Sequence, residues 1–477
     1  MPYNNRGGPS QKSTNWRRQP LVQQYPQQPF GTKIQSLVVD DLSPEAEAFE
    51  RKAVISGCVP VASYSWLNVQ DPTILVPGKP PRWTPLRTPS PLPEDSGDYY
   101  RDKNAARYPK HPMEPTVLAS LATPSSSSTP VDGDIDIVAC SSTLGNLLRF
   151  AKGQDKLFRM LVEVVDGTVF FIRRENFPTE LIEGVRGFGH SFPEYYTTWD
   201  SDVKDSDNHQ RILRYSLGGL SLLVRFGVDG YMISNTEKVN GTPIPAATSS
   251  VPSSLSALEA SLSTTKISSQ KSPATDSVSL RSGGEMVDQS AIFDLKTRSI
   301  KKKADDTIGD ELPRLWVAQI PNFILAYHQN GFFSEENIQI HDVRRQLETW
   351  EVDNSAALSK YAALLHRIVD LVRHGNCTKI EVCHTRAGIL EIREQLPACG
   401  DALSPAVKDM WHARRDLGGG ESSSEAEDEF KWDDQNDEDF TACTAACGYC
   451  GHCTYRQILG HCGGYLSRGH VTTCPHC

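Results

Sequence analysis

Three apolar runs that reverse direction at glycine-containing turns constrain the fold of this chain more than any other feature. "FRMLVEVVDGTVFFIRRE" turns at Asp166-Gly167, "HQRILRYSLGGLSLLVRFGVDGYM" at Gly218-Gly219, and "TKIEVCHTRAGILEIRE" at Gly388. Short turns of this kind join antiparallel strands, because glycine and aspartate tolerate the backbone angles of a tight hairpin. The sequence therefore predicts three β-hairpins.

Helical patterns accompany these hairpins. "STLGNLLRFAKG" and "ELPRLWVAQI" have apolar residues at helical spacing, and "NSAALSKYAALLHRIVDLVRH" is the strongest amphipathic segment. Its apolar residues recur every three or four positions, which places them on one helix face directed at a core. That stripe consists of Leu358, Tyr361, Leu365, Ile368, Val369 and Val372. We therefore predict an α/β (α+β) fold in which helices flank mixed β-sheets.

Composition divides the chain into segments. Residues 1–35 are rich in Gln, Pro and Asn and are predicted to be disordered, and residues 53–400 carry the globular patterns. Within that domain, residues 240–287 are rich in Ser and Thr and are predicted to be a disordered insertion. An acidic linker at 415–440 precedes a Cys-rich segment at 443–477.

The net charge of −10 is concentrated in one place, because residues 421–440 contain ten acids and one lysine. The rest of the chain is nearly neutral, which leaves room for a local basic groove that binds nucleic acid. No stretch approaches 18 consecutive apolar residues, and the first 20 residues lack the apolar region of a secretory signal. We expect no membrane association and a nuclear or cytoplasmic location.

The stretch "AIFDLKTRS", residues 291–299, suggests a catalytic site. Alternation along a strand places Asp294 and Lys296 on the same face. An acid at the end of an earlier strand, Asp229 in "SLLVRFGVD", completes the PD-(D/E)xK arrangement of metal-dependent nucleases. Carboxylates bind Mg²⁺ or Mn²⁺, and a lysine orients water and stabilises charge on a phosphate. The alternative is an exposed ion pair of little energetic value.

The surrounding segments resemble the DXO family of decapping exoribonucleases across residues 53–395. Six segments are similar to that family in the same order: "VPVASYSWL", "YYRDKNAARYPKHPMEP", "FRMLVEVVDGTVFFIRRE", "LLVRFGVDGYM", "FDLKTRS" and "LWVAQIPNFILAYHQNGFF". The resemblance implies a bilobal α/β fold with a divalent metal, Mg²⁺ or Mn²⁺, in a cleft. It also implies hydrolysis of RNA 5′ ends, such as triphosphates and NAD caps, with 5′-to-3′ RNA degradation.

The resemblance also assigns residues. Asp229 matches the second acid of the family's E-x-D motif, and Asp294 and Lys296 match its E-x-K motif with Asp in place of Glu. Gln319 matches the family's glutamine, and Glu194 is the nearest candidate for an earlier glutamate. We therefore expect Asp229, Asp294 and Glu194 to bind the divalent ion, and Lys296, Asp294 and Gln319 to act in catalysis.

Two departures from the family pattern weaken the implied activity. Gly227 stands where E-x-D has its first acid, and Ser141-Ser142 stand where the family has Arg-Gly. The first change removes a metal ligand and the second a phosphate-binding arginine. Three residues are candidates to replace that arginine: Arg186, Arg173 and Arg225.

The Cys-rich end predicts a zinc site. Seven of the 12 cysteines lie between Cys443 and Cys477. Two CxxC pairs about 20 residues apart provide four thiolates for one tetrahedral Zn²⁺. The first choice of ligands is Cys450, Cys453, Cys474 and Cys477, with Cys443, Cys462, His461 and His470 as further candidates.

Three functions are therefore open. The first is a metal-dependent hydrolase of RNA 5′ ends, weakened by the loss of one ligand acid. The second is a non-catalytic member of the same fold that binds RNA or a protein partner. The third rests only on the DDxxD pattern at 433–437, typical of prenyl-diphosphate synthases. Those enzymes are all-helical, which conflicts with the predicted strands. The sequence predicts no oligomeric state.

Overall fold

The three predicted hairpins form part of one large mixed sheet. The computed structural model describes residues 27–123, 134–233 and 277–417. In this sheet eleven strands lie side by side, and the three hairpins pair antiparallel as expected. In spatial order the strands are β1 (Lys33–Val38), β19 (Ile389–Glu394), β18 (Lys379–Arg386), β7 (Phe158–Val165), β8 (Thr168–Arg173), β6 (Ile137–Cys140), β12 (Leu220–Val228), β11 (Ser206–Leu217), β2 (Ser56–Leu67), β3 (Thr73–Gly78) and β14 (Ser279–Gly284).

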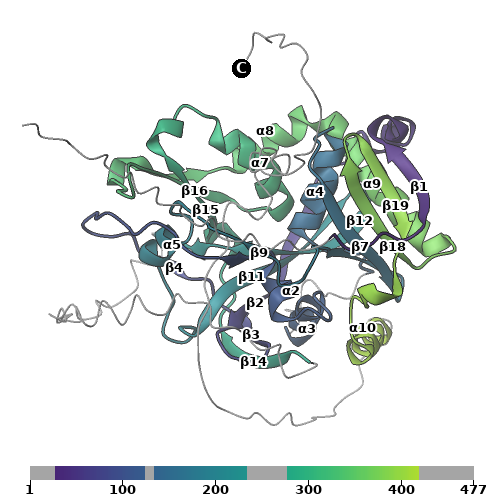
Figure 1. Cartoon of the computed structure of the whole chain (residues 1–477), viewed down its shortest axis with the longest axis horizontal. Helices are drawn as coiled ribbons and strands as arrows, with labels where there is room; N and C mark the ends of the chain where they lie inside the picture. The colour runs from purple at the N-terminus through teal and green to yellow at the C-terminus, as the bar shows by residue number, and fades with distance from the viewer. Residues whose placement is uncertain (1–26, 124–133, 234–276, 418–477) are drawn as a thin grey trace, which may run out of the picture.

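A second sheet has six strands, and the chain enters it directly from the large sheet. In spatial order these are β10 (Thr197–Thr198), β4 (Arg82–Trp83), β13 (Gly230–Tyr231), β15 (Ile292–Ser299), β16 (Asn322–His328) and β17 (Ile338–Asp342). Asp229 is the single residue between β12 and β13, so it marks the junction of the two sheets. Figure 1 labels β12 of the large sheet and β15 and β16 of the second sheet. A small third sheet pairs β5 (Tyr99–Tyr100) with β9 (Leu181–Ile182).

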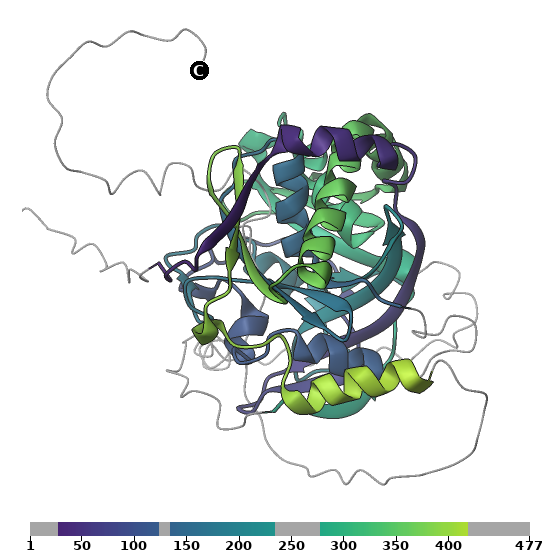
Figure 2. The same ribbon diagram turned by 90° about the vertical axis from the view of Figure 1, so that its right-hand side faces the viewer.

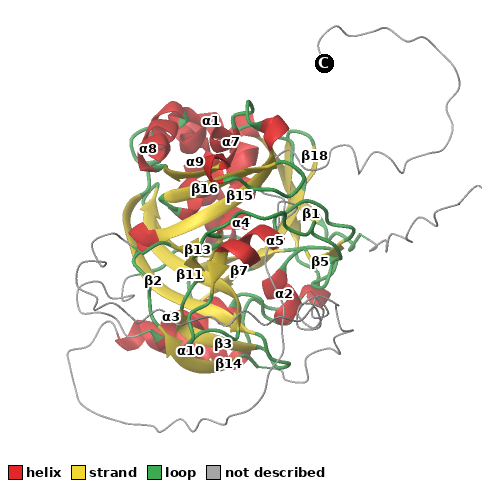
Figure 3. Ribbon diagram, turned by 90° about the vertical axis from the view of Figure 1, so that its left-hand side faces the viewer, coloured by secondary structure: helices red, strands yellow, loops and turns green. Residues whose placement is uncertain are grey.

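Helices cover both faces of the large sheet, as Figures 2 and 3 show. The α-helices of the described residues are α1 (Ser43–Ala46), α2 (Lys103–Arg107), α3 (Glu114–Ala122), α4 (Ser141–Ala151), α5 (Ser191–Tyr196), α7 (Thr307–Ala318), α8 (Arg344–Asp353), α9 (Ser355–His374) and α10 (Pro405–Leu417). Adjacent strand residues take opposite faces. Phe171 of β8 therefore packs in the cluster with α4, α7 and α9, and Phe170 in the cluster with α3 and α10. The predicted mixed α/β fold is confirmed.

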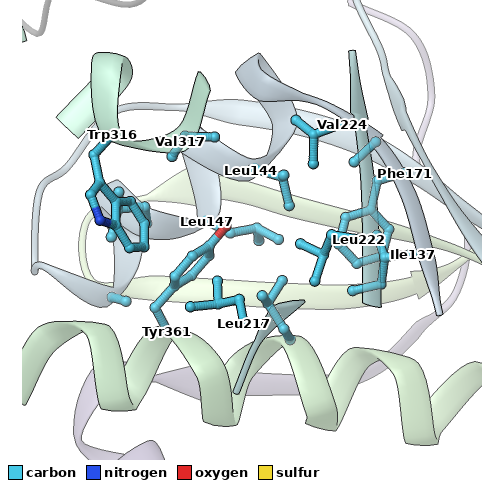
Figure 4. Close-up of a cluster of buried hydrophobic side chains, with 14 of the residues drawn as sticks. Ile137, Leu144, Leu147, Phe171, Leu217, Leu222, Val224, Trp316, Val317 and Tyr361 are labelled. Atoms are coloured by element: carbon cyan, nitrogen blue, oxygen red, sulfur yellow. The ribbon is translucent and has the colours of Figure 1, made fainter. Parts of the chain in front are cut away.

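The larger cluster forms the main core. The predicted stripe of α9 is buried in it, together with apolar residues of α4 and α7. Figure 4 shows the residues that meet there: Ile137, Leu144, Leu147, Phe171, Leu217, Leu222, Val224, Trp316, Val317 and Tyr361. Burying one such large side chain stabilises a fold by about 1.5–3 kcal/mol. This core holds α7 against the junction of the two sheets.

The structure corrects the predicted boundaries. Residues 33–35 belong to β1 and residues 279–284 form β14, although both lie in ranges predicted to be disordered. Each is an edge strand that gains its order by pairing, β1 with β19 and β14 with β3. Composition does not report such backbone pairing. The folded body also extends past the predicted 53–400, because it includes β1 and α1 before that range and α10 after it.

Several predicted segments lie outside the described residues. These are residues 1–26, 240–276, 418–440 and 443–477, including the proposed zinc ligands and the DDxxD pattern. In the described part of the chain, no helix combines the length and the apolar character that a membrane span requires.

Candidate functional site

A cleft of about 270 Å³ lies where the two sheets meet. Asp229 lines it from the junction, Asp294 and Lys296 from β15, and Glu194 from α5. The chain places Glu194 there because Asp95 accepts hydrogen bonds from the backbone N–H groups of His190 (3.0 Å) and Ser191 (2.9 Å) at the start of α5. The structure therefore brings four of the five predicted site residues to one cleft.

Asp229 is a buried acid beside a second acid. Its carboxyl accepts a hydrogen bond from the backbone N–H of Leu295 at 2.8 Å. Burial and the neighbouring charge of Asp294 raise the pKa of Asp229 to about 8. Without a cation beside the two acids, the neutral form of the Asp229 carboxyl is therefore favoured more than in a free aspartate.

Asp294 is held by an arginine that the sequence analysis did not anticipate. The guanidinium of Arg314 on α7 contacts both of its oxygens, with Nη2 donating to Oδ1 at 2.8 Å. Asp294 is 5 % exposed, and its paired geometry with Arg314 is the strongest form of a carboxylate–guanidinium contact. Both oxygens that were predicted to bind a metal are therefore committed to a side chain of the protein.

Glu311 extends this pairing to Lys296. The Glu311 carboxylate accepts from Arg314 Nε at 2.8 Å and lies 3.0 Å from Lys296 Nζ. Burial opposes ionisation of Glu311, but the charges of Arg314 and Lys296 outweigh it and lower its pKa to about 2. Asp294, Arg314, Glu311 and Lys296 thus form a chain of alternating charges, which we call the ion network. Its formal charges sum to zero.

The ion network exists because α7 crosses over β15. These two elements and β16 form a parallel β–α–β unit, in which the helix packs against the strands that it connects. Glu311 and Arg314 are three residues apart, so they share one face of α7. In the sequence, Glu311 and Arg314 stand within "DELPRLWVA", among apolar residues of the helix. From the sequence alone this charged pair has the same spacing as an ordinary exposed ion pair, so its role in the cleft could not be predicted.

The arrangement does not fit a divalent metal ion. Such an ion requires several carboxylate oxygens in one place. Both oxygens of Asp294 are bound by Arg314, and position 227 holds glycine. In the described ranges, no three or more His, Cys, Asp or Glu residues are grouped so that they could hold a metal. Glu194 lines the cleft without completing such a group.

Gln319 does not line the cleft. It ends α7 in the left-handed conformation, with φ 50° and ψ 41°, and its amide nitrogen donates to the carbonyl of Trp316 at 2.7 Å. Its own carbonyl accepts from the Gln289 amide at 2.9 Å. The structure therefore shows Gln319 as a helix-ending residue, and its predicted catalytic role has no support in this geometry.

Basic side chains line other parts of the cleft. They include Arg173 and Arg225. Ser141 and Ser142, where the family pattern has its arginine, also line the cleft. Arg225 Nη1 donates to the side-chain oxygen Oε1 of Gln210 at 3.2 Å. Of the three candidate replacements for that arginine, Arg173 and Arg225 thus lie in the cleft, whereas Arg186 is not among its lining residues.

The charges of the whole cleft favour an anion. Six basic side chains line it against five acidic ones. The basic residues are Arg101, Lys103, Arg173, Arg225, Lys296 and Arg314. Arginine recognises phosphate through paired hydrogen bonds, so this lining can bind a phosphate group.

Comparisons with known proteins give one family and several similar structures. A family model described as "Domain of unknown function (DUF8563)" matches residues 53–399. The sequence matches none of the curated proteins.

Among solved structures, S. pombe Rai1 in complex with 3′-FADP is 12% identical, with a TM-score of 0.47, covering 76% of this chain and 99% of that one. Scheffersomyces stipitis Rai1 in complex with (3′-NADP)+ and calcium ion is 10% identical, with a TM-score of 0.48, covering 82% and 100%. Candida albicans Rai1 in complex with pU5-Mn2+ is 9% identical, with a TM-score of 0.45, covering 82% and 99%.

Proposed function

We propose, for a chain that belongs to the DUF8563 family, that its cleft binds the 5′ ends of RNA through their phosphate groups without using a divalent metal. Two lines of evidence support this function. Six segments of the sequence resemble the decapping exoribonucleases, and residues of five of them line the cleft. The cleft also carries more positive than negative side chains.

The observation that carries the proposal is the Arg314–Asp294 pair. A guanidinium occupies both oxygens of the acid that best matches a metal ligand. A buried carboxylate needs one cation beside it, and an arginine supplies that charge permanently. The ion network is therefore complete without a metal, and an RNA phosphate is free to approach the basic residues around it.

A second candidate is the metal-dependent hydrolysis of RNA 5′ ends, with decapping or 5′-to-3′ exoribonuclease activity. It is favoured by one observation: Asp229, Asp294 and Lys296 line one cleft at the spacing of the nuclease motif. This function requires Arg314 to release Asp294, and binding of a metal would have to draw the proton from Asp229. The first candidate requires neither change.

One experiment distinguishes the two candidates. RNAs with a 5′ triphosphate, a guanosine cap or an NAD cap are incubated with the protein in Mg²⁺, in Mn²⁺ and in EDTA, and both binding and 5′-end release are measured. The Asp294→Ala variant is run in parallel. Metal-independent binding with no release by either protein supports the binding function. Release that needs metal and is lost in Asp294→Ala establishes the hydrolase.

A matched control tests whether binding occurs in the cleft. Arg225→Gln removes a basic residue of the cleft, whereas Lys302→Gln removes a lysine whose side chain is 63 % exposed and does not line the cleft. We expect weaker RNA binding only for Arg225→Gln. Equal affinity of both variants and wild type for every RNA would place any binding elsewhere.

A further inference from the structure

A second cavity, of about 260 Å³, adjoins the cleft. Its lining includes six basic residues and a single acid, Glu175. We call it the basic cavity. Its basic residues are Arg101, Arg149, Lys156, Arg159, Arg173 and Arg174. Arg101, Ser142 and Arg173 line both spaces, so the basic cavity continues from the cleft without an intervening layer of residues.

Two arginines of the basic cavity share one buried carboxylate. Arg159 Nε lies 2.6 Å from Glu381 Oε1, and Arg174 Nη1 lies 2.9 Å from Glu381 Oε2. Glu381 is 0 % exposed. One carboxylate balances one guanidinium, so this pair of arginines carries one positive charge that Glu381 does not neutralise.

Arg174 also has an unused donor. Its Nη1 is buried and meets Glu381 as an ion pair at 2.9 Å without hydrogen-bond geometry. This guanidinium nitrogen therefore keeps hydrogen-bonding capacity that an anionic oxygen in the cavity can use. Arg174 therefore offers an anionic ligand both a positive charge and a hydrogen-bond donor.

The rim of the basic cavity is partly apolar. Leu157 is 49 % exposed, and it lines the cavity next to Phe158. The amides of Asn146 and Asn176 line it as well. A basic surface with an adjacent apolar contact suits a nucleotide, because the phosphate meets the cations and the base covers the apolar side chain.

We propose that the basic cavity binds a phosphate of the same single RNA strand whose 5′ end lies in the cleft. This inference rests on the proposed function, and it adds that recognition extends beyond the terminal nucleotide. Arg173 and Ser142 provide the connection between the two spaces. Arg174 holds the internal phosphate, and Arg159, whose nitrogens donate to Glu381 and to two backbone carbonyls, contributes its charge. The ligand of the basic cavity is therefore a phosphodiester of a continuing strand.

The test compares ligands of different lengths. Calorimetry measures the binding of 5′-monophosphorylated RNAs of one, two and six nucleotides, and of pyrophosphate. The variant is Arg174→Gln, which leaves Arg159 paired with Glu381, and the control is Lys302→Gln, which is outside both cavities. We expect the six-nucleotide RNA to lose about tenfold in affinity in Arg174→Gln, the size of one charge-assisted contact. The mononucleotide should bind the variant and wild type equally.

Each alternative outcome has a separate meaning. If affinity does not rise with length in wild type, or if Arg174→Gln binds the six-nucleotide RNA normally, the inference fails while the proposed function stands. If no RNA of any length binds, the proposed function itself fails. Pyrophosphate that binds as tightly as the six-nucleotide RNA and depends on Arg174 indicates a site for free phosphate, which also overturns the inference.

A second variant tests the inference if Arg174→Gln does not fold. If Arg174→Gln loses its cooperative thermal transition, Leu157→Glu replaces it, because this side chain is half exposed and adds a negative charge at the rim. The same loss of affinity for the six-nucleotide RNA is expected, and unchanged affinity contradicts the inference.

Discussion

The cleft and the basic cavity adjoin each other but balance their charges differently. In the cleft, the ion network pairs Asp294, Arg314, Glu311 and Lys296 in alternation, so every member has a partner. In the basic cavity, Arg159 and Arg174 share the single carboxylate of Glu381. A balanced network needs no metal, whereas an excess of positive charge favours an anionic ligand. The difference fits our proposal that the basic cavity binds a phosphate beside a nuclease-like motif whose acid is held by arginine.

The largest expected effect is on stability, and it differs between Arg314 of the cleft and Arg174 of the basic cavity. Arg314→Gln leaves the buried Asp294 without its cation and should lower the free energy of unfolding by about 3–5 kcal/mol. Arg174→Gln should cost about 1 kcal/mol or less, because Arg159 remains on Glu381. Urea unfolding of both variants measures this contrast. Similar losses for both would mean that the two regions do not differ in charge balance.

The pH dependence of stability tests the protonated acid of the cleft. The pKa of Asp229 rises from its ordinary value of 3.8 to about 8 in the folded state. Between these two values the unfolded chain has released this proton and the folded chain retains it. Stability should therefore fall as pH rises from 5 to 8, by up to about 1.4 kcal/mol per pH unit from this group.

Asp229→Asn isolates that contribution. The amide does not titrate, so the variant should gain stability relative to wild type as pH rises. Glu311 does not interfere, because its pKa of about 2 lies below its ordinary value of 4.5 and affects stability only at lower pH. Unfolding curves of the two proteins at pH 5 to 8 provide the measurement. A constant difference across this range would contradict a protonated Asp229.

Adding a carboxylate at position 227 and removing Arg314 should allow the cleft to bind a divalent metal ion. A side chain fits at Gly227, because an added Cβ would lie no closer than 3.5 Å to Gln210. We expect Gly227→Glu combined with Arg314→Gln to bind Mn²⁺ at least about tenfold more tightly than wild type, measured by electron paramagnetic resonance. Gly227→Glu alone should show little gain, since Arg314 still holds Asp294. Equal gains in the single and double variants would show that Arg314 is no obstacle to metal.

The smallest effect concerns Gln319, which lies outside both cavities. Glycine adopts the left-handed conformation without the penalty of a side chain, but Gln319→Gly loses the hydrogen bond to Trp316. These opposing terms should leave the change in unfolding free energy within about 1 kcal/mol, with RNA binding unchanged. A large loss of RNA binding at unchanged stability would restore the functional role that the family resemblance implies.

Sequence patterns predicted much of the fold and part of the site. The hairpins at Asp166-Gly167 and Gly218-Gly219 follow from local turn chemistry, and the stripe of α9 follows from helical periodicity. The strand β14 was missed because its sequence is polar and its order comes from pairing with β3. Asp229, Asp294 and Lys296 were found by spacing, whereas Gln319 matched a motif but faces its own helix.

The sequence by itself determined the hairpins, the apolar stripe of α9 and the common strand face of Asp294 and Lys296, because turn residues and periodicity act over a few neighbouring positions. Only the tertiary structure decided that Asp229 joins them in one cleft and which partners they have there. The partners of Asp294 and Lys296 are Arg314 and Glu311, about 15 to 20 positions later on a different element. Charge, protonation and metal affinity depend on such contacts, and spacing along the chain does not specify them.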